Sequence, residues 1–273
     1  MNKRVISAIA AIPVAFLFIL WGGFPFFMLT LGILIAGLFE FYNMCSAKKI
    51  PAIKWWGATA AMFLLINSYF ITSGKYIMWG KDPTVFIVTA SIMGTMIIII
   101  LQRELKEALL KAGITLLGVF YVVWLGGHMI FLRDIEPFGF RYTLIAFTVT
   151  WAADIGAYYS GFSFGRKTLH IASPNKSRAG AAGAVIAGAL TMIAAVYILA
   201  LNEYINLSHS IVMGALVGIF AVFGDLSESV IKRNCSFKDS GVFLPGHGGV
   251  LDRIDSLLFT VPLVYYYIVW IIL

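Results

Sequence analysis

Acidic residues in the apolar parts of this 273-residue chain are the first candidates for chemistry. Six lie within or beside long apolar runs: Glu40, Asp154, Asp225, Glu228, Asp252 and Asp255. A carboxylate within hydrocarbon costs at least about 2.5 kcal/mol, so its presence needs a reason. Hard oxygen ligands with few His or Cys residues nearby favour Mg²⁺, which also binds substrate phosphates. We therefore expect Asp225, Asp252 and Asp255 to hold Mg²⁺, with or without a second cation.

The spacing of these acids agrees with a shared site. Asp252 and Asp255 are three residues apart at the start of a helix, so they share a face, and the helix dipole favours negative charge there. On the preceding helix one face carries polar residues at i, i+4, i+7 and i+8, namely Asp225, Ser229, Lys232 and Arg233.

The alternative is that the acids are solvated helix ends that pair with neighbouring lysines and arginines. This interpretation is favoured for Glu40, and for Glu228 it is as strong as the functional one. It is disfavoured for Asp225, Asp252 and Asp255, because three charges recur where few are tolerated.

Residues 229–255 combine positive charge with glycines. The basic residues that can pair with phosphates are Lys232, Arg233, Lys238 and Arg253. The glycines immediately before a helix N-terminus, where backbone N–H groups bind anions, are Gly246, Gly248 and Gly249. The stretch predicts a phosphate-bearing substrate, with His247 as a hydrogen-bonding loop residue rather than a metal ligand. Ser229 is a further candidate for substrate binding.

A second polar segment, Ser173-Pro174-Asn175-Lys176, offers a hydroxyl and an ammonium group to phosphate, and a plain solvated turn is a nearly equal alternative. Asp154, on a separate apolar segment, is a candidate to complete the site. Cys45 and Cys235 stand in no metal or redox spacing.

The elements that must position these residues lie in a membrane. Hydrophobic residues make up 60% of the chain and charged residues only 12%, with mean hydropathy +0.91. Soluble domains carry about 25% charged residues. The composition therefore excludes a soluble globule, a disordered chain and a disulfide-stapled secreted domain. The net charge of +7 raises nucleic acid as a partner, but the basic residues occupy short gaps between apolar runs and form no basic face.

We expect an all-α integral membrane protein, a polytopic bundle of about nine transmembrane helices, because lipid leaves unpaired backbone groups no partner. The predicted spans are residues 5–21, 25–44, 55–74, 84–102, 109–132, 139–162, 180–201, 207–224 and 252–273. Residues 5–44 are alternatively a re-entrant hairpin. We expect an N-terminal region (1–138, about five spans) and a C-terminal catalytic region (139–273) with cytoplasmic loops 163–179 and 225–251.

The basic residues also predict orientation. With a cytoplasmic N-terminus, 16 of the 20 lysines and arginines lie on the cytoplasmic side, as the positive-inside rule expects. The C-terminus then lies on the opposite side, and all six acids lie near the cytoplasmic ends of their helices. We expect an integral protein of the bacterial cytoplasmic (inner) membrane, with its active site facing the cytoplasm.

Residues 229–255 resemble the signature of the phosphatidate cytidylyltransferases (CDP-diacylglycerol synthases). The matching positions are Ser229, Lys232-Arg233, Lys238-Asp239, Leu244-Pro245, His247-Gly248-Gly249, Asp252-Arg253 and Asp255. Gly224-Asp225-Leu226 also fits, and a second motif matches at Asp154, Ala157-Tyr158, Gly161, Phe164-Gly165, Ser173-Pro174 and Lys176. After Lys176 the family pattern has Thr, Trp, Glu and Gly, whereas this chain has Ser177, Arg178, Ala179 and Gly180.

The resemblance implies transfer of CMP from CTP to phosphatidate in the membrane, giving CDP-diacylglycerol and pyrophosphate, and it also implies a homodimer. Alternatives are a related lipid kinase, a cytidylyltransferase for another lipid phosphate, and, less favoured, an ion-coupled transporter. The Asp-Gly, two residues, Ala-Arg pattern of the CDP-alcohol phosphotransferases does not occur in the sequence. Nucleic acid is not an expected partner.

Overall fold

A computed structural model describes residues 13–74, 82–103, 106–241 and 248–273. The chain divides into two compact units. Unit 1 comprises Met1–Asp134 and Cys235–Arg253, and unit 2 comprises Ile135–Asn234 and Ile254–Leu273. Each unit therefore combines segments that are distant in the sequence.

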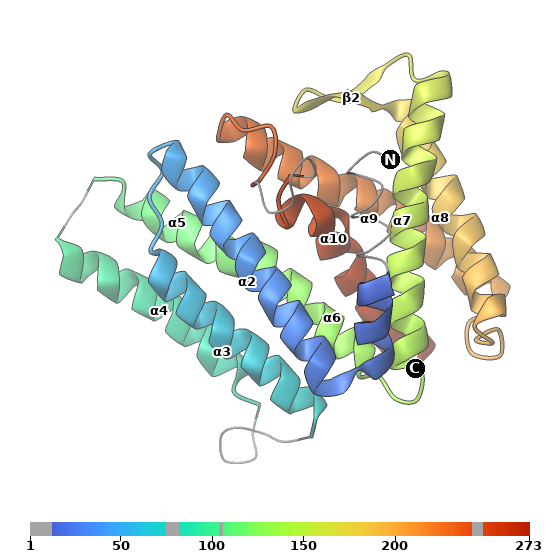
Figure 1. Cartoon of the computed structure of the whole chain (residues 1–273), viewed down its shortest axis with the longest axis horizontal. Helices are drawn as coiled ribbons and strands as arrows, with labels where there is room; N and C mark the ends of the chain where they lie inside the picture. The colour runs from blue at the N-terminus through green and yellow to red at the C-terminus, as the bar shows by residue number, and fades with distance from the viewer. Residues whose placement is uncertain (1–12, 75–81, 104–105, 242–247) are drawn as a thin grey trace. The chain divides into compact units, whose positions relative to one another are not determined.

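Unit 1 is built from helices of the N-terminal half (Figure 1). They are α2 (Gly23–Ala47), α3 (Lys54–Thr72), α4 (Thr84–Gln102), α5 (Ala108–Gly118), the π-helical η1 (Val119–Trp124) and α6 (Leu125–Arg133), and residues 13–21 are also helical. Tyr42 on α2 is fully buried, and its hydroxyl donates to the Thr115 carbonyl of α5 (2.7 Å). A methyl group at Gly57 or Gly118 would collide with its ring, so these two glycines let α3 and α5 approach α2.

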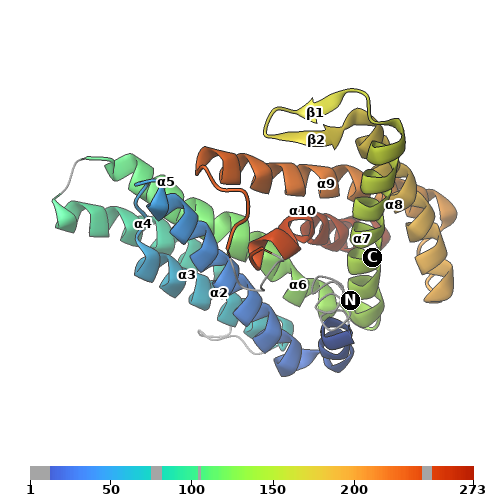
Figure 2. The same ribbon diagram turned by 45° about the horizontal axis from the view of Figure 1, so that its top comes forward.

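Unit 2 contains α7 (Gly139–Phe164), α8 (Arg178–Ile198) and α9 (Leu207–Asn234). In both ribbon views α7 and α8 lie side by side and α9 crosses α7 (Figures 1 and 2), and the three helices share a buried contact of alanines. Glycines allow this close packing, as is common between membrane helices. A Cβ atom at Gly188 would lie 2.5 Å from the Gly214 carbonyl oxygen, and one at Gly218 would lie 2.5 Å from that of Ala184. Most of α10 (Leu251–Tyr267) and the π-helical η2 (Ile268–Ile272) complete this unit.

The helices confirm an all-helical integral membrane protein. Among the described residues, six helices are long and apolar enough to cross a membrane: Gly23–Ala47, Thr84–Gln102, Ala108–Arg133, Arg178–Ile198, Leu207–Asn234 and Leu251–Ile272. α3 and α7 cover most or all of two further ranges that the sequence predicted as spans, 55–74 and 139–162, with α3 ending at Thr72.

Two polar segments contain more regular structure than the sequence predicted. Within the expected loop 163–179, β1 (Thr168–His170) pairs antiparallel with β2 (Ser173–Ser177). The helix α9 continues past the apolar run to Asn234, through the first part of the expected loop 225–251. Lys232 and Arg233 lie in its last turn, where positive charge interacts favourably with the helix dipole.

Candidate functional site

A close approach of α9 and α10 brings acidic residues together in unit 2. Gly224 lies at this approach: a Cβ atom there would be 2.6 Å from the Asp255 carbonyl oxygen and 3.0 Å from Ser256 Cα. Only glycine fits without a shift of the backbone, and the next residue, Asp225, is thereby carried to the side of α10 that bears Asp255.

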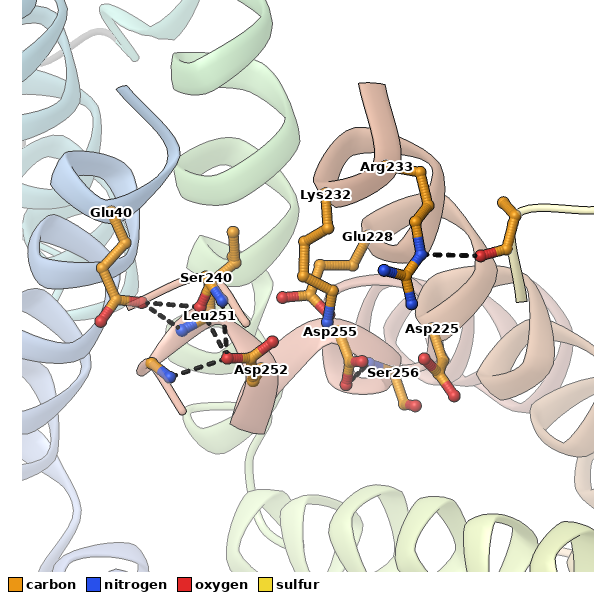
Figure 3. A network of polar contacts seen from close by, with 12 residues as sticks. Glu40, Asp225, Glu228, Lys232, Arg233, Ser240, Leu251, Asp252, Asp255 and Ser256 are labelled. Carbon is orange, nitrogen blue, oxygen red and sulfur yellow. Dashed lines mark hydrogen bonds and ion pairs between the residues drawn. The ribbon is translucent and has the colours of Figure 1, made fainter. Parts of the chain in front are cut away.

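The acidic cluster consists of Asp225, Glu228 and Asp255. Each residue offers a carboxylate oxygen, and these atoms all lie within 4.8 Å of one another. Three hard oxygen donors this close fit a divalent cation such as Mg²⁺, and their mutual repulsion makes positive charge between them favourable. Figure 3 shows Asp225, Glu228 and Asp255 with the neighbouring Lys232 and Arg233.

A fourth acid is connected to the cluster through a serine. Asp255 Oδ1 accepts a hydrogen bond from the Ser256 backbone N–H (2.7 Å). The Ser256 hydroxyl in turn donates to Asp154 Oδ1 (3.2 Å), which reaches it from α7. Asp154 thus contacts Ser256 from a separate helix, and its part in the site stays a prediction.

Two lysines form ion pairs with acids of the cluster, and an arginine on α9 contacts the neighbouring hairpin. Lys176, on β2, forms an ion pair with Asp225 (Nζ to Oδ2, 2.5 Å). Lys232 pairs with Glu228 one helical turn earlier (Nζ to Oε2, 2.7 Å), and the Glu228 side chain is fully buried. Arg233 donates from Nε to the Ala172 carbonyl (3.3 Å), at the turn of the β1–β2 hairpin. The hairpin therefore lies against α9 and brings Lys176 to the acids.

The serines predicted to bind substrate also lie in unit 2. Ser229 is buried on α9, one residue after Glu228. Ser173 is half-buried at the start of β2, where it pairs in register with His170.

A separate polar network lies in unit 1, around the N-terminus of α10. Asp252 Oδ2 accepts from the backbone N–H groups of Ser240 (2.9 Å) and Gly249 (2.7 Å). Glu40, on α2, accepts from the N–H groups of Val250 and Leu251 (2.9 Å each). Figure 3 shows Glu40, Ser240, Leu251 and Asp252 together. Glu40 was expected to be a solvated helix end that pairs with basic side chains; here it is half-buried and binds backbone N–H groups.

The predicted site residues thus fall into two groups. Unit 2 brings together Asp154, Lys176, Asp225, Lys232, Arg233 and Asp255, and it also holds Ser173 and Ser229. Unit 1 holds Lys238 and Arg253, both exposed, together with Gly248, Gly249 and Asp252. His247 lies outside the described residues.

Glu228 is the member of the acidic cluster that the sequence left undecided. Its signal is the spacing of three residues from Asp225, which places two carboxylates on neighbouring positions of one helix face. Spacing could not decide its role, because Lys232 stands four residues further on and the pair also suits an ordinary helix salt bridge.

Comparison with known proteins finds relatives that match almost the whole chain. A protein from Synechocystis sp. named phosphatidate cytidylyltransferase is 33% identical, with the alignment covering 98% of this chain and 96% of that protein. Proteins of the same name from Bacillus subtilis and Staphylococcus haemolyticus are 28% and 29% identical, and each alignment covers 96% or more of this chain and 97% of the relative.

The match to the family is equally extensive. The model of the cytidylyltransferase family covers residues 2–271. Its range includes both motifs, the acidic cluster and the network around Asp252. The chain belongs to the cytidylyltransferase family.

Proposed function

We propose that this membrane enzyme transfers CMP from CTP to phosphatidate, forming CDP-diacylglycerol and pyrophosphate for phospholipid biosynthesis. The observation that carries the proposal is the acidic cluster with its two paired lysines, in a chain matched almost end to end by proteins named phosphatidate cytidylyltransferase. In the reaction a phosphate oxygen of the lipid attacks the α-phosphorus of CTP. The bond from that phosphorus to the oxygen bridging the β-phosphate breaks, and pyrophosphate leaves.

The attacking oxygen is already ionised at neutral pH, so the chain needs no general base. The obstacle is the repulsion between two polyanions, which basic side chains can offset. In this proposal the basic residues that bind phosphates are Lys176, Lys232, Arg233, Lys238 and Arg253. Further substrate contacts come from Ser173, Ser229, His247, Gly248, Gly249 and Asp154.

Asp225 and Asp255 are the proposed Mg²⁺ ligands in the acidic cluster, together with Glu228, and Asp252 remains a predicted ligand. When bound, the ion neutralises phosphate charge and stabilises the leaving pyrophosphate. Lys176 forms an ion pair with Asp225, and its ammonium group can leave this carboxylate to bind an incoming phosphate.

The proposal also includes the membrane arrangement. It comprises about nine spans, a cytoplasmic N-terminus, a C-terminus on the opposite side and catalysis at the cytoplasmic face of the bacterial inner membrane. Residues 139–273 form the catalytic region, and the resemblance adds a homodimer. The excess of basic residues in the cytoplasmic segments supports this orientation.

Purified protein with phosphatidate, Mg²⁺ and CTP labelled at the α-phosphate tests the activity. We expect labelled CDP-diacylglycerol, no labelled lipid when the label is at the γ-phosphate, and loss of product when EDTA removes the metal. A lipid kinase would transfer the γ-label and release CDP. The absence of CDP-diacylglycerol over a range of lipid and salt conditions contradicts the proposal.

A further inference from the structure

Residues on both sides of positions 242–247 form hydrogen bonds with Glu40, a carboxylate that lies far away in the sequence. Glu40 Oε1 accepts from the Val250 N–H, and Glu40 Oε2 accepts from the Leu251 N–H, each at 2.9 Å. Leu251 is the first residue of α10, so Glu40 binds two backbone donors at a helix N-terminus, where negative charge is favoured. Glu40 is part of neither sequence motif.

Glu40 and Asp252 are connected through one hydroxyl group. Ser240 Oγ lies 3.1 Å from Glu40 Oε2 and 2.9 Å from Asp252 Oδ2. A hydroxyl has one hydrogen, so it donates to one carboxylate at a time. Ser240 is 5% exposed, and its own N–H is bound to Asp252. The acid on α2 and the aspartate on α10 therefore share one donor, which lies within hydrogen-bond distance of both.

The glycines of the segment leave room for these two acids. A Cβ atom at Gly249 would collide with Glu40 Oε2, and one at Gly241 would lie 2.6 Å from Glu40 Oε1. Gly248 has φ +79°, and a Cβ atom there would lie 2.5 Å from Asp252 Oδ2. The backbone thus closes around both carboxylates, and a side chain at these positions would push a carboxylate out of its place.

We propose that Glu40 is a positioning residue for CTP binding: it fixes the backbone of Gly248 and Gly249 and the carboxylate of Asp252 in one arrangement. The inference rests on the proposed function, which assigns these residues to the phosphates and the metal. Glu40 touches neither substrate in this proposal and acts through the N-terminus of α10.

Glu40→Gln tests this role, because it keeps the side-chain length but replaces one accepting oxygen with a donor. We expect KM for CTP to rise about 10-fold, the loss that one hydrogen bond to a charged group explains, while KM for phosphatidate stays within about twofold. Glu40→Asp keeps the charge and should recover part of the affinity for CTP. A variant that folded poorly would instead lower kcat through fewer active molecules and leave KM unchanged.

Hydrogen exchange on the full-length protein in nanodiscs gives a second readout that needs no turnover. Peptides covering residues 248–252 should exchange faster in Glu40→Gln than in the wild type. The matched control is Glu203→Gln, an exposed acid outside the network, which should change neither the exchange nor KM.

Unchanged exchange at residues 248–252, or an unchanged KM for CTP, overturns the positioning role. An inactive wild-type protein contradicts the proposed function instead, and the exchange comparison still decides whether Glu40 holds the segment.

Discussion

At the scale of single residues, two opposite charges inside unit 2, Glu228 and Lys232, stabilise each other. Glu228 is fully buried, and its Oε2 lies 2.7 Å from Lys232 Nζ. Within a protein interior, removal of one member of such a pair leaves a charge without its main partner, whereas removal of both is often tolerated. The pair also keeps Lys232 beside the acidic cluster, so in the proposed function its loss lowers both stability and phosphate binding.

We therefore predict that Glu228→Gln and Lys232→Met each lower the free energy of unfolding by about 3 kcal/mol. The double variant should recover at least half of this stability but not the formation of CDP-diacylglycerol, because the phosphate-binding ammonium group is gone. Thermal unfolding of the detergent-solubilised protein measures the first effect and product formation the second. Effects on stability that simply add in the double variant would contradict the coupling.

Asp255 provides a second prediction at this scale. Asp255→Asn removes one negative charge from a cluster whose oxygens lie within 4.8 Å of one another, so the cluster should bind a divalent cation less tightly. We expect kcat to fall by about 100-fold or more. The Mg²⁺ concentration for half-maximal activity should rise.

A titration of Mg²⁺ at saturating CTP measures both quantities for Asp255→Asn. Glu203→Gln, which removes a negative charge from an exposed position, is the control and should leave the titration unchanged. An Asp255→Asn enzyme with wild-type Mg²⁺ dependence would show that Asp255 is not a metal ligand.

At the scale of elements, the acidic cluster depends on how closely α9 and α10 pack. Gly224→Ala would place a methyl group 2.6 Å from the Asp255 carbonyl oxygen, and a backbone atom cannot rotate away. The helices must separate, which costs about 1–3 kcal/mol and moves Asp225 relative to Asp255. We predict a lower unfolding temperature and at least a tenfold loss of kcat, since small displacements of positioned groups reduce rates strongly.

The chain offers a matched control for this substitution. Gly113 lies within α5, and a Cβ atom there meets nothing within 4 Å. Alanine also has the higher helix propensity, so Gly113→Ala should preserve activity and stability. Equal behaviour of the two alanine variants would argue against the close approach at Gly224.

At the scale of the whole molecule, the proposed orientation places the β1–β2 hairpin in the cytoplasm. Ile171, at its turn, is 91% exposed, so a cysteine there is open to reagents. The native Cys45 and Cys235 are buried and should react slowly. We predict that Ile171→Cys reacts with a membrane-impermeant maleimide in inverted vesicles and not in intact spheroplasts.

A cysteine between α8 and α9 serves as the control on the opposite side. Asn202 is exposed, and Asn202→Cys should react in spheroplasts only. The reverse pattern at both positions would overturn the proposed orientation.

Much of the helical content was predictable, because an apolar run of span length has few other stable structures in lipid. Helices α2, α4 and α8 follow the predicted spans 25–44, 84–102 and 180–201 closely. The β1–β2 hairpin and the end of α9 were less predictable. Their hydrogen bonds and ion pairs involve residues that hydropathy counts only as polar, such as Lys176 and Arg233.

The sequence by itself determined that the protein is a helical membrane protein, and its motifs identified Asp225, Asp255, Lys176 and Lys232 as candidates. Composition and spacing suffice for this, because the cost of a charge in lipid makes each one informative. Only the tertiary structure decided which of these acids meet.

Contacts across the chain explain that difference. The approach of α9 and α10 at Gly224 joins Glu228 to the acidic cluster, although spacing left its role open. Glu40 lies 210 residues before Val250 in the sequence and yet accepts its backbone hydrogen bond. Every residue except proline has a backbone N–H group, so the sequence cannot show which of these groups binds Glu40. Spacing alone therefore assigned Glu40 to solvent.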